Sequence, residues 1–252
     1  MSAASQKESS LMSHPGQGFE HIYTVDETLI RKQQEMALEI AAAGKTAAAA
    51  LELGLSAIIW TEHLIDGFES ANVLPFPLAC RPGCDCCCFN QVEVTPPEAL
   101  LLGNYVDRHF SEPQKQALRD KLARVAPVRT GKSKKEIARM RRELPCPLLS
   151  RGRCLVYPVR PLVCRAMHSF DAEDCRQALE SRDLVSVPHY SHRHDFAGSI
   201  SQGLLAGCGA LGCQAAVLDL AQALEDYFRQ PNAVERWIRG EKVFSLRTGV
   251  RL

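Results

Sequence analysis

Five of the eleven cysteines in this 252-residue chain lie in the stretch "CRPGCDCCCFN", residues 80 to 90. Thiols gathered this closely suit disulfide bonding, redox exchange or metal coordination. Four more follow between residues 146 and 175, and eight of these nine thiols, all but Cys86, fall into two spaced groups. The first group is Cys80, Cys84, Cys87 and Cys88, and the second is Cys146, Cys154, Cys164 and Cys175.

The spacing of these thiols favours metal coordination. Two residues separate Cys84 from Cys87, a gap that lets both thiolates turn toward one ion, and Gly83 adds flexibility there. The adjacent Cys87 and Cys88 point to opposite sides in extended backbone, so they fit two ions or a polynuclear cluster better than one ion. Thiolate-rich sites select zinc, copper(I) and iron–sulfur clusters. We therefore expect the eight cysteines to hold an iron–sulfur cluster or zinc, with the cluster slightly favoured.

The other two chemistries fit less well. The N-terminus lacks a secretory signal and no run of about 18 apolar residues occurs, so we expect a cytoplasmic protein without a membrane span, where stable disulfides are rare. A redox dithiol at Cys84 and Cys87 would need a strand–helix–strand pattern, which does not surround them. Cys208 and Cys213 lie outside the two groups, and we expect them to be buried as small hydrophobic residues.

Charged and nitrogen-bearing residues accompany the cysteines. Four thiolates around one zinc leave about two negative charges, which nearby arginines could balance. The candidates are Arg81, Arg151, Arg153, Arg160, Arg165 and Arg176, and an ordinary surface role for them stays open. The polar segment "HYSHRHD" favours a solvated loop for His189, His192 and His194, whereas His168, close to Cys164, is a better candidate to orient a ligand.

The overall charge gives no global attraction to nucleic acid, because the formal net charge is +1. The segment 119–143 carries ten Lys or Arg against three Asp or Glu, but it lacks interleaved aromatic residues. That pattern favours a solvated helical face. A protein partner held by residues 132–142 stays an alternative, whereas nucleic acid and membrane are not expected.

Two stretches, "CRPGCDCCCFNQVEVTPPE" and "PCPLLSRGRCLVYPVRPLVCRAMHSFDAEDC", resemble the YkgJ-like cysteine-cluster family over about residues 80–176. The resemblance includes the pattern formed by Tyr157, Arg160, Pro161, Cys164 and Arg165. It implies a candidate zinc- or iron-chelating protein. We expect a redox or regulatory role for the bound metal, and the alternative is a zinc-dependent structural or interaction module.

Cys86 departs from the family pattern, so it is either a replacement ligand or a spare thiol. Some relatives are labelled lysine methylases of flagellin, which would imply S-adenosylmethionine as methyl donor. The chain shows no glycine-rich strand-to-helix turn for such a nucleotide. Whether it is an enzyme therefore stays open, with catalytic and cofactor-binding residues unassigned.

Helical patterns flank the cysteine-rich middle. Two helices, or one helix kinked at Gly44, are expected from near Asp26 to near Gly67, and Thr95 caps another helix. Further helices are expected over about 111–125, 215–228 and 231–240, with one short strand in "FNQVEV". The expected parts are a disordered N-terminus (1–20), a helical N-terminal part (21–70), a cysteine-cluster metal-binding region with a helical insertion (71–180) and a helical C-terminal part (181–252). The fold class is mostly α, with at most a short strand or two around a loop-rich, cysteine-ligated centre.

Overall fold

The computed structural model describes residues 12–13, 24–129 and 132–246. The predicted disordered N-terminus, residues 1–20, lies outside these ranges except for residues 12–13. The mostly helical fold is confirmed. The α-helices are α2 (Glu27–Ala42), α3 (Ala47–Ala71), α4 (Pro96–His109), α5 (Glu112–Arg129), α6 (Lys134–Met140), α7 (Leu162–Ala166), α8 (Ala172–Glu180), α9 (Ser191–Ala210), α10 (Leu220–Arg229) and α11 (Ala233–Ile238).

Short strands and 3-10 helices connect these helices. The strands form three antiparallel pairs of two residues each, which pair β1 with β5, β2 with β6 and β3 with β4. Their bounds are β1 (Met12–Ser13), β2 (Glu93–Val94), β3 (Leu149–Ser150), β4 (Arg153–Cys154), β5 (His189–Tyr190) and β6 (Leu218–Asp219). The 3-10 helices are η1 (Cys86–Phe89), η2 (Arg141–Glu143) and η3 (Tyr157–Val159). The strand expected in "FNQVEV" is reduced to β2.

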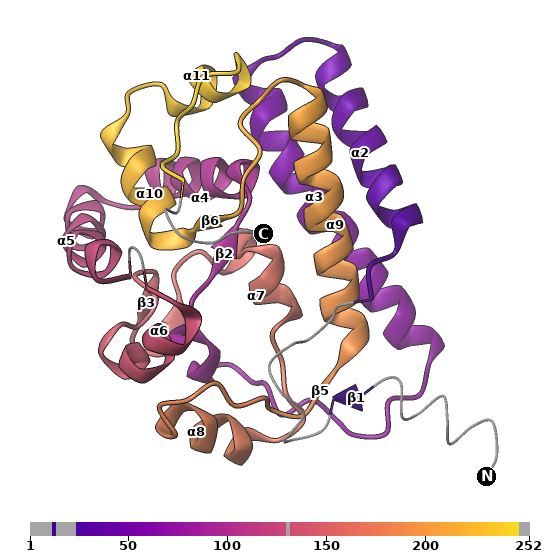
Figure 1. Ribbon diagram of the computed structural model, residues 1–252, viewed down its shortest axis with the longest axis vertical. Helices are drawn as coiled ribbons and strands as arrows, with labels where there is room; N and C mark the ends of the chain where they lie inside the picture. Colours follow the sequence, from indigo (N-terminus) through magenta and orange to yellow (C-terminus); the bar gives the residue numbers. More distant parts are fainter. Residues whose placement is uncertain (1–11, 14–23, 130–131, 247–252) are drawn as a thin grey trace.

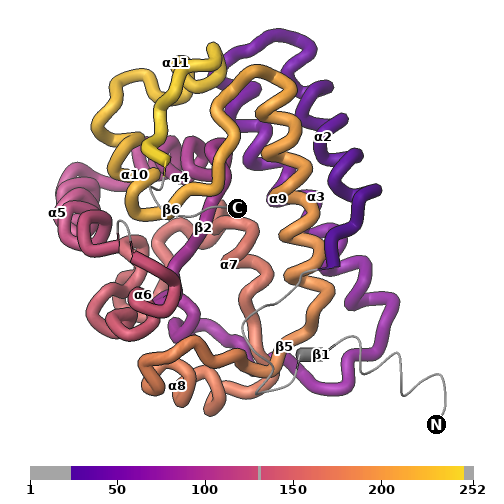
Figure 2. Tube along the Cα trace, in the orientation of Figure 1, coloured from indigo at the N-terminus to yellow at the C-terminus, as the bar shows by residue number. Residues whose placement is uncertain are grey.

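The long helices α2, α3 and α9 run side by side along one side of the molecule (Figure 1). Helices α4, α5, α10 and α11 lie on the other side, and α7 lies between the two groups (Figures 1 and 2). The cysteine-bearing segments occupy the lower part of the view, near α6, α7 and α8. Helices from both ends of the chain therefore form the frame that carries the cysteines.

Local sequence signals explain the N-terminal helices. The Asp26 side chain accepts hydrogen bonds from two backbone N–H groups at the start of α2, as expected of an N-cap. Gly44, at a φ of 131°, breaks the helix, and Thr46 caps α3. Helix α9 then approaches α2 closely, because a Cβ at Gly203 would lie 2.5 Å from the Ile30 carbonyl oxygen. The predicted break at Gly44 is confirmed.

Helix α3 is, within the described ranges, the helix that is long and apolar enough to cross a membrane, and 44% of its apolar window is buried inside the structure. Buried core helices pass the same length and composition test. Leu53, Ala57 and Ile58 of α3 belong to the hydrophobic core.

The sequence patterns missed three helices and misplaced a fourth. Helices α7 and α8 lie where a loop-like stretch was expected. Helix α9 includes His192 and His194, which were expected to lie in a loop, whereas His189 lies in β5. Residues 215–219 were expected to be helical, but they include β6 and α10 begins only at Leu220.

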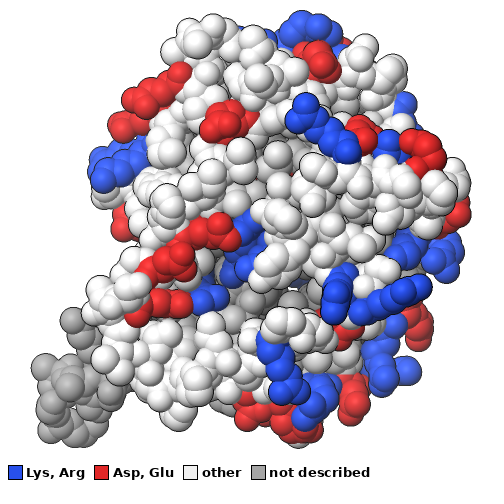
Figure 3. Space-filling model, turned by 180° about the vertical axis from the view of Figure 1, so that it is seen from behind, with Lys and Arg blue, Asp and Glu red and all other residues white. Residues whose placement is uncertain are grey.

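The basic segment 119–143 was expected to be a solvated face, and this is wrong for two of its arginines. Arg129 is 2% exposed and Arg141 is 5% exposed. On the face shown in Figure 3, Lys and Arg side chains alternate with Asp and Glu rather than forming a patch of one sign.

Candidate metal centre

A tight turn and a 3-10 helix present the first cysteines. The Cys84 N–H donates to the Arg81 carbonyl at 3.0 Å, with Pro82 and Gly83 at the two central positions. Gly83 has a φ of 90°, and a type II turn requires a positive φ at its third position. The η1 turn follows at once and carries three consecutive cysteines, of which Cys87 and Cys88 are hydrogen-bonded to each other through their thiols.

A β-hairpin presents Cys154. Arg151 and Gly152 form the two-residue loop between β3 and β4, and their φ values of 50° and 72° suit a type I′ turn. Cys154 pairs with Leu149 across the hairpin. The Cys146 N–H, just before β3, donates to the Cys88 carbonyl at 2.7 Å. This hydrogen bond joins the two cysteine groups of the sequence.

A buried carboxylate positions Cys164. Glu98 completes the capping box of α4 by accepting from the Thr95 N–H and hydroxyl, each at 2.7 Å. Its other oxygen accepts from the Leu162 N–H at 2.8 Å, at the start of α7. Glu98 is 2% exposed, and burial raises its pKa. Since Cys164 lies on α7, the link from α4 to Leu162 sets its place.

Ser169 holds Cys80 beside Cys175. The Ala79 N–H donates to the Ser169 carbonyl at 2.9 Å, and the Cys80 thiol lies 4.0 Å from the same oxygen. The Ser169 hydroxyl donates to the Pro188 carbonyl and acts as a hydrogen-bond partner of Cys175. Residues far apart in the sequence therefore meet around one buried serine.

The nine cysteines of this region sort into two sets, in which each thiol either acts on the pKa of another member or is itself acted on by one. The inner set is Cys87, Cys88, Cys146, Cys154 and Cys164, and the outer set is Cys80, Cys84, Cys86 and Cys175. Three inner thiols pack against the hydrophobic core. Cys87 also acts on Cys80 and Cys86, so it lies where the two sets meet. The structure thus mixes the two groups of the sequence and places Cys86 in the outer set.

Burial and neighbouring thiols keep several of these cysteines protonated at neutral pH. Burial raises the pKa of Cys146 and of Cys175 to about 11 each, and it raises the pKa of Cys164 well above the ordinary value. Hydrogen bonding to Cys88 raises the pKa of Cys87. A metal ion that binds here must therefore displace protons.

Cations partly oppose these shifts. Arg160 acts to lower the pKa of Cys87 and Cys154, and Arg165 acts in the same direction on Cys154. Other cation–thiol neighbours are Arg129 and Lys121 with Cys146, Arg193 with Cys80, and Arg176 with Cys86. By contrast, Arg81, Arg151 and Arg153 are exposed, which agrees with an ordinary surface role for these three arginines.

Arg165 also holds the "RP..CR" segment in shape. Its guanidinium donates to the Arg160 and Pro158 carbonyls at 2.9 and 2.7 Å and pairs with Glu62 of α3. Arg165 is buried, so its hydrogen bonds fix the backbone that precedes α7.

All eleven cysteines are free thiols, and Cys208 and Cys213 are buried core residues as expected. Among the residues that the structure describes, no group of three or more His, Cys, Asp or Glu side chains is arranged to hold a metal ion. The donor set suits soft metals chemically. The thiols would have to turn toward an ion in order to coordinate it.

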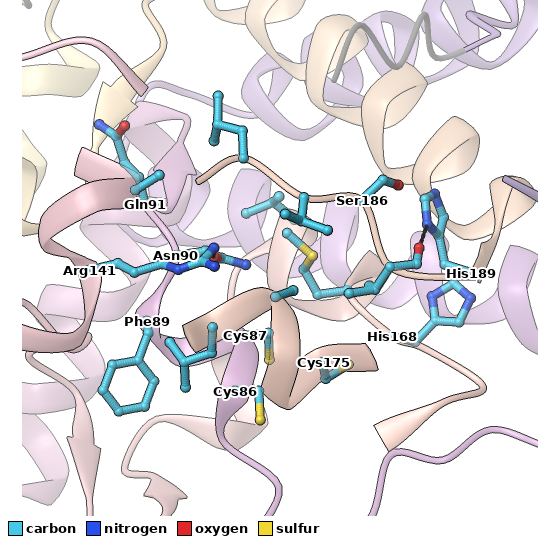
Figure 4. A pocket seen from close by; sticks show the side chains of 18 of the residues that line it. Cys86, Cys87, Phe89, Asn90, Gln91, Arg141, His168, Cys175, Ser186 and His189 are labelled. Atoms are coloured by element: carbon cyan, nitrogen blue, oxygen red, sulfur yellow. Dashed lines mark hydrogen bonds between the residues drawn. The ribbon is translucent and has the colours of Figure 1, made fainter. Parts of the chain in front are cut away.

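A cavity of about 360 Å³ opens beside the outer set (Figure 4). The four outer thiols and Cys87 line it, and Cys86, Cys87 and Cys175 lie near one another in its wall. His189 and Arg141 also contribute to the wall. The cavity therefore combines a thiol cluster with a buried cation.

The expectation of solvated histidines was wrong. His189, His192 and His194 are 6%, 4% and 8% exposed, and His189 and His194 line the cavity. His168 accepts from the Tyr190 N–H at 2.8 Å through Nε2 and donates from Nδ1 to the Ala166 carbonyl at 2.6 Å. Both ring nitrogens of His168 are thus engaged by backbone groups. The small residues that follow "HYSHRHD" were the available signal for helix α9.

The site is a thiol-rich, cation-supported cluster of the kind that binds soft metals or iron–sulfur centres. Residues 79–183 match the family model CxxCxxCC, described as a "putative zinc- or iron-chelating domain". This match confirms the resemblance to the cysteine-cluster family over this segment. The chain has three residues instead of two between the first two cysteines, Cys80 and Cys84. Comparison with curated proteins and with solved structures gives no match.

Proposed function

We propose that this domain holds an iron–sulfur cluster, or zinc in its place, through the inner and outer cysteine sets. Metal chelation is the property of the matched domain. The observation that carries the proposal is the gathering of nine thiols from segments around residues 80–88, 146–164 and 175, which the sequence keeps far apart.

The arrangement of adjacent thiols supports a polynuclear centre. Cys86, Cys87 and Cys88 are consecutive in η1, and Cys87 acts on thiols of both sets. A cluster with several metal atoms accommodates consecutive thiolates more readily than one ion. A cluster would supply electron transfer when bound, whereas zinc would contribute folding free energy.

Metal analysis tests this proposal. The protein is purified without oxygen, its visible absorption is recorded, and iron, sulfide and zinc per chain are measured. Iron with sulfide and visible absorption supports a cluster, and colourless protein with stoichiometric zinc supports the zinc alternative. Folded protein that binds neither metal would refute both.

Serine variants test the two sets. Cys164→Ser removes an inner thiol and Cys175→Ser an outer thiol, so each is expected to lower metal content. Cys208→Ala is the matched control, because Cys208 is buried in α9 outside the two sets. Equal metal loss in all three variants would point to general unfolding rather than lost coordination.

A further inference from the structure

Arg141 is a buried cation without an anionic partner. It lies at the start of η2, is 5% exposed, and lines the cavity beside the outer set. Its Nη1 and Nη2 reach Asn90 Oδ1 and Ser181 Oγ only at 3.5 and 3.4 Å, longer than ordinary hydrogen bonds. Its Nε has no hydrogen-bond partner among the residues that the structure describes.

No acidic side chain of the described residues forms an ion pair with Arg141. Burial lowers its pKa, and only the exposed Asp183 acts from a distance in the other direction. The other charged residues of the wall, Glu93 and Lys134, pair with each other at 3.5 Å. A buried guanidinium is stabilised when an anion accepts its hydrogen bonds.

The remaining wall is mainly apolar. It includes Ile137, Val163, Met167, Leu179 and Leu184. A volume of about 360 Å³ falls in the usual range for sites of small organic ligands. Such apolar walls can contact a carbon chain or ring, whereas they offer few polar contacts to a hydrated inorganic anion.

We propose that this cavity binds a small organic carboxylate. The carboxylate accepts paired hydrogen bonds from Arg141, and the apolar body lies along the wall with its far end toward the outer thiols. The inference goes beyond metal binding, because Arg141 belongs to neither cysteine set, although the outer thiols that we propose as metal ligands line the same cavity.

Calorimetric titration of the purified protein, with its metal content as isolated, tests the site. Hexanoate is the probe, hexanamide is its uncharged match, and inorganic phosphate is the anion without an apolar body. We expect hexanoate to bind ~10-fold or more tighter than either, as the loss of a charge-assisted hydrogen-bond pair implies. Equal binding of hexanamide or phosphate, or no binding of hexanoate, would overturn the proposal.

Neighbouring arginines provide a matched pair of variants. Arg141→Gln is expected to weaken hexanoate binding ~10-fold or more, whereas Arg142→Gln leaves it unchanged because Arg142 is exposed and outside the cavity. Equal losses in both variants contradict the assignment. In wild-type protein, the arginine Nε–H resonance of Arg141 should shift with hexanoate and not with hexanamide, so the test survives a variant that fails to fold.

Discussion

Acid should destabilise this protein through one histidine, His168. Its Nε2 accepts from the Tyr190 N–H at 2.8 Å, which requires the neutral ring. Protonation would place two donors face to face inside the structure. Burial accordingly lowers the pKa of His168 to about 4, and the positive charge of Arg193 acts in the same direction.

The sign and size of the effect follow from linkage. A base whose pKa is lowered by folding contributes its full stability above its unfolded pKa of 6.5 and loses it as the pH falls toward about 4. Between about pH 7.5 and pH 5 only the unfolded state takes up the proton. The free energy of unfolding should therefore drop by about 2 kcal/mol through His168 alone.

The assay compares urea unfolding of wild type and His168→Gln at the two pH values. Glutamine can still donate and accept one hydrogen bond each, but it does not titrate. Subtracting the two pH responses removes the contribution of the thiols, which both proteins share. We expect a difference of about 2 kcal/mol. His109→Gln is the control, because His109 is exposed on α4 and should respond as wild type does. Equal responses in wild type and His168→Gln would refute the reasoning.

Three further outcomes follow from the contacts of named residues. Glu98→Gln would place an amide N–H against a backbone N–H donor at Thr95 or Leu162. Thermal unfolding should therefore show that the free energy of unfolding falls by about 1–3 kcal/mol, and unchanged stability would contradict the buried link. Gly203→Ala forces a Cβ within 2.5 Å of an α2 carbonyl, and chemical denaturation should reveal a loss of about 1–3 kcal/mol. Because the pKa of Cys146 is about 11, zinc binding near pH 7 should release about one proton per ligating thiol, so calorimetric enthalpies should vary with buffer and affinity should fall as the pH falls.

Local signals made much of the fold predictable from the sequence. Asp26 and Thr95 are caps whose side-chain chemistry defines helix starts, and both helices begin where these residues predict. Gly44 likewise marks a break that its φ of 131° requires. Such features depend on near neighbours in the chain, so one sequence can disclose them.

The features that the sequence did not predict depend on contacts between residues far apart in the chain. The polar residues around His192 read as a loop because their partners, such as Glu69 of α3, lie far away in the chain. The grouping of the thiols was hidden for the same reason, since Cys175 meets Cys80 through Ser169 and not through its own sequence neighbours. Arg141 looked like one more surface cation until its burial was known.

The frame around the thiols determines which of them can adjust to a metal. The inner thiols Cys146, Cys154 and Cys164 pack against the core, and Glu98 ties the helix of Cys164 to α4. Cys84 of the outer set is exposed and follows a flexible Gly83 turn. An ion that needs the thiols to reorient therefore meets less resistance at the outer set, where the cavity also opens. For this reason we expect removal of metal by a chelator to begin at the outer cysteines, while Cys146, Cys154 and Cys164 retain their positions against the core.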